Sequence, residues 1–194
     1  VIYTSGTTGR PKGVMVEHHQ LFSFVNENNF VNHLKSEVIA GISNYAFDGS
    51  IFDIFYPLAN GKELVLLTKN DLQDLSKIDD KFIKNKVDTV FITTALFNSL
   101  VINQSKCLGT LRQILFGGEA CSKEVINTFK SRYKKALLIH VYGPTENIVY
   151  SSYCDLNKCD TSIVVPIGSH LADKKLYVLD VHLMPVPIGV IGEL

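Results

Sequence analysis

The sequence predicts an α/β fold in which parallel or mixed sheets are flanked by helices, with a more β-rich C-terminal portion. Short apolar runs alternate along the chain with amphipathic stretches, which is the pattern of successive strand–helix units. The runs at 64–67 and 90–92 are apolar without alternation, and this indicates strands buried on both faces of a parallel sheet. After Pro144, strand-like runs separated by polar and Pro/Gly turns replace the alternating units.

The expected elements follow from these runs in chain order. Strands are predicted, as β-rich apolar segments, at Val38–Ser43, Glu63–Thr68, Thr89–Thr94, Arg112–Phe116 and Leu137–Tyr142, and later at Ile148–Tyr153 and Lys175–Leu179. Helices are predicted, from apolar residues recurring on one face, at Asp74–Lys86 and at Ser122–Tyr133, the second opening with a serine cap. Ligands of such sheets bind beyond the carboxyl ends of the strands, so the loops there are where the site is expected.

Composition excludes several classes of function. The 194 residues carry 19 basic and 19 acidic side chains, and this balance removes the electrostatic case for a nucleic acid or an anionic membrane as partner. No apolar run approaches the roughly 18 residues of a membrane span. The cysteines at 107, 121, 154 and 159 are too few and too irregular for a disulfide framework, so we expect thiols buried in a reducing cytoplasm.

The segment from Tyr3 to Gly13 is suited to holding a polyphosphate. It combines glycines, Ser/Thr hydroxyls and Lys12 directly after a predicted strand. Glycines let the backbone approach phosphate closely, hydroxyls and amides donate hydrogen bonds, and a lysine supplies a mobile positive charge. The segment lacks the Gly-Lys-Ser/Thr ending of a Walker A loop and does not match the dinucleotide fingerprint.

Two further loops follow predicted strands. Tyr142-Gly143-Pro144-Thr145-Glu146 places a carboxylate beside a hydroxyl, a pair of hard oxygen ligands that suits Mg²⁺, with a tyrosine able to stack on a base. Leu115-Phe116-Gly117-Gly118-Glu119 runs from a strand into a glycine pair, where a flat ligand could lie against bare backbone. Taken alone, each also fits an ordinary turn.

In this order and spacing, the three segments resemble the adenylate-forming superfamily, and most closely the amino-acid-activating adenylation domains of nonribosomal peptide synthetases. The resemblance runs along the whole chain, and Gly189–Leu194 is similar to the start of a further family signature. It implies that residues 1–194 are the central part of the large adenylation (AMP-binding) subdomain, without its N-terminal portion and its C-terminal lid. The isolated chain is then expected to adenylate poorly or not at all, and to aggregate through uncovered sheet edges.

The resemblance also implies roles for residues. Catalysis falls to Lys12, Thr145 and Glu146, with Glu146 as the metal ligand. ATP or AMP is bound, across the three segments, by Ser5, Gly6, Thr7, Thr8, Gly9, Lys12, Gly117, Gly118, Glu119, Tyr142, Gly143 and Thr145. The implied cofactors are ATP, Mg²⁺ and a phosphopantetheine arm on a partner carrier domain. The implied partners are an amino-acid substrate, a peptidyl carrier protein domain and neighbouring synthetase domains.

The resemblance further implies an amino-acid pocket, formed by Asp48, Gly49, Phe52, Phe91, Leu115, Gly117, Val141, Val149 and Tyr150. A carboxylate among aromatic rings needs a cation as partner, so Asp48 is expected to hold the substrate ammonium. The other positions are uncharged and resemble isoleucine-type pockets. From the residues alone, Asp48 fits a helix cap and Phe91, Leu115 and Val141 fit plain core packing.

Two alternatives stay open. One is another adenylate-forming ligase, such as an acyl-CoA or D-alanine carrier-protein ligase, which would not depend on Asp48. The other is a nucleotide-binding or carrier-docking module without turnover.

Overall fold

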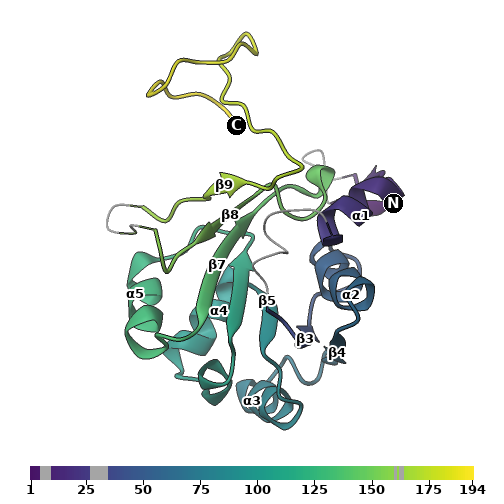
Figure 1. Cartoon of the computed structure of the whole chain (residues 1–194), viewed down its shortest axis with the longest axis vertical. Coiled ribbons are helices and arrows are strands. Elements are labelled where there is room, and N and C mark those ends of the chain that lie inside the picture. The colour runs from purple at the N-terminus through teal and green to yellow at the C-terminus, as the bar shows by residue number, and fades with distance from the viewer. Residues whose placement is uncertain (5–9, 27–34, 160, 162–163) are drawn as a thin grey trace.

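The computed structural model describes residues 1–4, 10–26, 35–159, 161 and 164–194 (Figure 1). The predicted phosphate-binding residues Ser5, Gly6, Thr7, Thr8 and Gly9 therefore lie outside the described residues. Among the described residues, seven strands form one sheet in the order β4-β3-β5-β6-β7-β8-β9. These strands, in chain order, are β3 (Val38–Gly41), β4 (Glu63–Leu66), β5 (Thr89–Thr93), β6 (Gln113–Gly117), β7 (Leu137–Tyr142), β8 (Ser152–Asp155) and β9 (Ser169–His170).

The strand directions confirm the predicted mixed sheet. Strands β4, β3, β5, β6 and β7 pair in parallel, whereas β8 and β9 add antiparallel pairs at one edge. A separate antiparallel hairpin is formed by β1 (Ile2–Thr4) and β2 (Lys12–Val14). The parallel strands all end at the same edge of the sheet, which brings the loops that follow them together.

Helices cover both faces of this sheet, as the unalternated apolar runs predict. Helices α3 (Leu75–Lys84), α4 (Thr94–Ile102) and α5 (Lys123–Arg132) pack on one face, and α1 (His18–Asn26) and α2 (Gly49–Ala59) pack on the other (Figure 1). Strand β6 illustrates the arrangement, because Ile114 and Phe116 enter the first core while Leu115, between them, enters the second. All three are fully buried.

Several predicted boundaries were wrong. Thr94 does not extend β5 but begins α4, and the Thr93 hydroxyl accepts a hydrogen bond from Leu96 N–H (3.3 Å) as the helix cap. Ser122 occupies the cap position of α5 but makes no cap hydrogen bond, because its hydroxyl bonds the Glu124 carboxylate instead. No helix was predicted for the segment of α4, whereas the helix start expected at Asp48 agrees with α2, which begins at Gly49.

The C-terminal portion is less regular than predicted. The segment 175–179 forms no strand; only isolated bridges join Leu179 to Pro185 and to Glu193. This segment projects away from the body of the molecule (Figure 1). The strand predicted at 148–153 begins only at Ser152, since Ile148 and Val149 have left-handed backbone conformations with φ of 51° and 66°.

Candidate functional site

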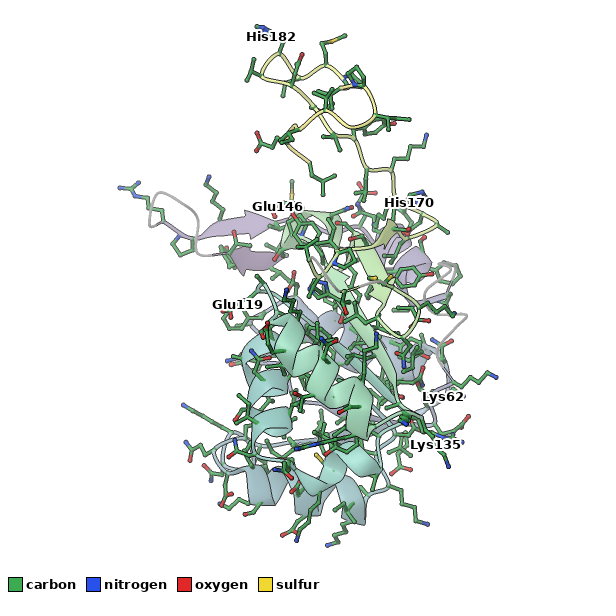
Figure 2. All side chains as sticks on the ribbon, turned by 90° about the vertical axis from the view of Figure 1, so that its left-hand side faces the viewer. Lys62, Glu119, Lys135, Glu146, His170 and His182 are labelled. Carbon is green, nitrogen blue, oxygen red and sulfur yellow. The ribbon has the colours of Figure 1, made fainter. Side chains whose placement is uncertain are left out.

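The corner after β7 is built on a close approach between two backbone segments. A Cβ added at Gly143 would lie 2.6 Å from Ser151 N and 2.7 Å from Val149 O, so only glycine fits without displacing that backbone. The chain then turns through Pro144 into the short 3₁₀ helix η3 (Thr145–Asn147), which carries Thr145 and Glu146. Figure 2 shows Glu146 at the same end of the molecule as Glu119.

A strained turn links this corner to the amino-acid pocket positions. Ile148 and Val149 are β-branched, and their positive φ values place them in a region that such residues rarely occupy. Tyr150 N–H donates to the Ile148 carbonyl (2.8 Å), which closes a three-residue turn around Val149. The side chains of all three residues are nevertheless buried, so the surrounding packing offsets the backbone strain.

The loop after β6 is fixed by hydrogen bonds from Thr94, a residue for which the sequence predicted no role in the site. Thr94, at the start of α4, donates from its hydroxyl toward the carbonyls of Gly117 (3.3 Å) and Glu119 (3.0 Å). Gly117 touches β7 so closely that an added Cβ would lie 2.1 Å from Val141 O. Gly118 follows with a φ of 95°, which favours glycine.

The predicted pocket residues other than Asp48 come together in one apolar cluster. Its aromatic members surround Tyr150: the ring centroids of Phe52 and Phe91 lie 5.8 Å and 5.5 Å from that of Tyr150. Leu115, Val141 and Val149 are buried in the same cluster. A Cβ on Gly49 would lie 2.7 Å from the Phe91 ring, so this glycine lets Phe91 approach α2.

The sequence predicts a buried carboxylate at Asp48, but in the structure Asp48 is half-buried and Asp53 is the fully buried acid. Asp48 precedes α2 without capping it and is half-buried, so it is more exposed than the predicted buried carboxylate. Asp53 is the buried acid, 1% exposed, and its Oδ2 accepts from the N–H groups of Ile42 (2.9 Å) and Ser43 (2.7 Å). Its Oδ1 has no hydrogen-bond partner among the described residues.

The two carboxylates affect neighbouring groups. Burial raises the pKa of Asp53 to about 6, and the hydrogen bonds from Ser43 and Ile42 limit this rise. Burial raises the pKa of the Tyr150 hydroxyl well above its ordinary value, and the negative charges of Asp53 and Asp48 raise it further. Both acids therefore lie within electrostatic range of Tyr150. Burial of Asp53 beneath α2 could have been anticipated from its position one turn after Gly49 on an otherwise apolar helix.

Two further predicted residues, Lys12 and Tyr142, are exposed. Lys12 lies on β2 opposite Thr4 and is exposed. Tyr142 is 41% exposed and borders a cavity of about 300 Å³ together with Pro144, Asn147 and Ser151. An exposed aromatic face beside a cavity suits stacking against a planar ligand.

The family of AMP-binding enzymes matches residues 1–194. The chain belongs to this family. It is 43% identical over its whole length to bacitracin synthase 1 of Bacillus licheniformis and 38% identical to surfactin synthase subunit 1 of Bacillus subtilis. It spans only 4% and 5% of the lengths of these two relatives.

Solved structures agree on the fold of an adenylation domain. PA1221, a nonribosomal peptide synthetase protein containing adenylation and PCP domains, is 30% identical and superposes with a TM-score of 0.86, over 96% of this chain and 32% of its own. The N-terminal subdomain of Klebsiella oxytoca NpsA shares the fold, with a TM-score of 0.84 at 22% identity, over 98% of this chain and 49% of its own. The chain is thus part of an adenylation domain of the nonribosomal peptide synthetase type.

The η3 corner of this adenylation domain fits a hard cation. Glu146 is exposed, and Thr145 beside it is half-buried, so a carboxylate and a hydroxyl oxygen are both accessible. Mg²⁺ takes one or two protein oxygens and completes its shell with water and phosphate, which matches this donor set.

Within the described part of the chain, no helix has the length and hydropathy needed to cross a bilayer.

Proposed function

We propose that the chain is the central part of a large adenylation subdomain that activates isoleucine or a similar aliphatic amino acid. The reaction forms an aminoacyl-adenylate, whose acyl group passes to a phosphopantetheine thiol. The observation that carries this proposal is the convergence of the predicted pocket residues other than Asp48 on one apolar cluster, with Phe91 partly exposed at its edge.

Asp48 is the proposed anchor of the substrate ammonium. Its charge acts on the buried Tyr150 hydroxyl, which supports a position facing the cluster rather than open water. A carboxylate at the edge of an apolar cluster gains more from a cationic partner than one surrounded by water. A fatty or aryl acid offers no such cation, so this acid favours an amino acid.

Selectivity for an aliphatic side chain is proposed to come from the packed neighbours of Tyr150. Phe52, Phe91 and Leu115 supply apolar surface, and no member of the cluster is charged. Rejection of valine would depend on about one methylene, worth roughly 1–3 kcal/mol. We therefore expect isoleucine to be preferred and valine to be activated more slowly.

The reaction is the attack of the substrate carboxylate on the α-phosphorus of ATP, with pyrophosphate leaving. In this proposal the exposed Tyr142 stacks on the adenine, the Gly117–Glu119 loop lies along it, and Thr145 binds the α-phosphate. Lys12 and residues 5–9 hold the outer phosphates, whose negative charge increases as pyrophosphate departs. Mg²⁺, held by Glu146, would neutralise part of that charge when bound.

The proposed partners follow from the relatives. The similar synthetases are long proteins, and PA1221 joins an adenylation domain to a PCP domain. We propose that a peptidyl carrier domain and neighbouring synthetase domains are also the partners here, and that the protein acts in the cytoplasm.

Amino-acid-dependent pyrophosphate exchange by the complete adenylation domain containing these residues tests the proposal. Exchange should be fastest with isoleucine, and valine should be slower by roughly 10–200-fold in kcat/KM. Asp48→Asn, which removes the charge but keeps the shape, should abolish exchange with every amino acid. Asp80→Asn, the same change at an exposed position of α3, should leave exchange unchanged.

Each part of the proposal can fail separately. Fastest exchange with a charged or aromatic amino acid would overturn the aliphatic assignment. Exchange with fatty or aryl acids that Asp48→Asn does not affect would assign the domain to another class of adenylate-forming ligase.

A further inference from the structure

Two cysteine thiols meet where β8 ends. The Asp155 carbonyl accepts hydrogen bonds from the backbone N–H groups of Lys158 (3.0 Å) and Cys159 (3.1 Å), which turns the chain back toward the strand. The turn brings the Cys159 side chain back against the core cluster that contains Cys154, on β8. Both cysteines are free thiols.

The same two thiols border one cavity of about 460 Å³. Cys154 is 2% exposed and belongs to the core on the α5 face, whereas Cys159 is half-buried at its edge. Lys158 also lines the cavity, and its side chain is 81% exposed, so the cavity reaches the surface. A small reagent that enters this cavity would therefore meet Cys159 as the more exposed of the two thiols.

The other two cysteines have different surroundings. The Cys107 thiol is buried and interacts with the Asp79 carboxylate. Cys121 contacts oxygen atoms, of the Asn98 side chain and the Ser122 carbonyl, each at 3.7 Å. Cys154 and Cys159, by contrast, border one cavity and pack against one core cluster.

We propose that Cys154 and Cys159 form a redox modification site, which closes to an intramolecular disulfide by exchange with a small disulfide such as oxidised glutathione. The Cys159 thiolate attacks one sulfur of the reagent, forming a mixed disulfide and releasing one glutathione thiolate. Cys154 then loses its proton and attacks the Cys159 sulfur, releasing the second glutathione. The protein loses two electrons and two protons, and one oxidised glutathione becomes two reduced molecules.

The disulfide would join the end of β8 to the turn beyond it. Cys154 pairs with His140 of β7 and Asp155 pairs with Ile139, so the link would lie beside the antiparallel edge of the sheet. β7 leads directly into Tyr142 and the η3 corner. The site does not depend on the proposed adenylation, because it involves none of the residues assigned to it.

Redox titration of the 194-residue chain with reduced and oxidised glutathione tests this site. Trypsin cleaves after Lys158, so the disulfide joins two otherwise separate peptides, 136–158 and 159–174, which mass spectrometry detects. Because the fold already holds the thiols together, the equilibrium constant for the disulfide should be at least about tenfold larger in the native chain than in 6 M guanidinium chloride. Circular dichroism establishes that the native sample is folded.

Two variants provide controls. Cys159→Ser should abolish the joined peptide, whereas Cys121→Ser, at another half-buried cysteine, should leave both the peptide and the equilibrium constant unchanged. The proposal is overturned if the native constant equals or falls below that of the unfolded chain, or if Cys154 pairs with another cysteine or retains glutathione instead.

Discussion

At the residue scale, the buried Asp53 makes stability depend on pH. Its pKa is raised from 3.8 to about 6, so between these values the folded chain holds a proton that the unfolded chain has released. Raising the pH through this window therefore lowers the free energy of unfolding, by at most about 3 kcal/mol, and the loss is complete above pH 6. Asp53→Asn should remove this component.

Urea unfolding of both proteins between pH 4 and pH 7 measures the effect. Subtracting the slope of Asp53→Asn from that of wild type cancels the opposite contributions of the acids whose pKa is lowered, namely Asp71, Asp74 and Glu124. Asp80→Asn, at an exposed position, should keep the wild-type slope. A wild-type slope in Asp53→Asn would show that this carboxyl titrates normally in the folded chain.

Gly143 tests the close approach that shapes the η3 corner. In Gly143→Ala the new Cβ would lie 2.6–2.8 Å from the backbone of residues 149–151, which must move. We expect a loss of about 1–3 kcal/mol in the free energy of unfolding, typical of overpacking. Gly109→Ala is the matched control, because its Cβ would meet no atom within 4 Å.

Urea denaturation measures both alanine variants. An equal effect at positions 143 and 109 would mean that the corner relaxes freely, and the geometry of Thr145 and Glu146 would then not depend on this glycine.

At the scale of elements, the caps of α3 and α5 provide a contrast. Asp74 caps α3, since its Oδ1 accepts from Ser76 N–H and from the Ser76 hydroxyl, both at 2.8 Å. Ser122 occupies the same position on α5 without a cap hydrogen bond. Asp74→Ala should therefore lower the thermal midpoint by a few degrees, and Ser122→Ala by less. A scanning calorimetry result in the reverse order would contradict this assignment of the caps.

Elements with a clear local pattern were predictable from sequence. The parallel strands and the helices α3 and α5 alternate in short, well-separated units, so periodicity located them to within a few residues. Only the start of helix α2, beside Asp48, was predicted, because its run from Gly49 to Ala59 is apolar around much of its circumference and contains Pro57. Helix α4 was missed because it follows β5 directly, with Thr93 serving as both strand end and cap.

The site was predictable where a motif determines backbone shape, and less so where tertiary packing decides. The glycines at 117 and 143 were identified from sequence, and each proves to lie against a neighbouring strand or turn. The hydrogen bonds that Thr94 donates and those that Asp53 accepts depend on contacts between separate elements, which spacing along the chain does not reveal. Ile148 has a left-handed backbone conformation, which β-branched residues disfavour, so the packing of its buried side chain must maintain the turn.

At the scale of the whole molecule, charge and exposed apolar surface together govern solubility. The formal net charge at pH 7 is zero, which removes long-range repulsion between copies. The C-terminal segment that projects from the body in Figure 1 exposes large apolar side chains, with Ile188 at 107% and Ile191 at 97% exposure. Neutral molecules that expose such side chains are prone to associate.

Ile188→Lys combined with Ile191→Lys should therefore raise the solubility of the chain at pH 7 while leaving its thermal midpoint unchanged, because neither side chain packs in the core. Gln73→Lys combined with Ala95→Lys adds the same charge at exposed positions without removing isoleucine surface. Light scattering at increasing concentration compares the two doubly substituted chains. If the control pair gains as much solubility as the isoleucine pair, net charge alone limits solubility and the exposed segment has no part in association.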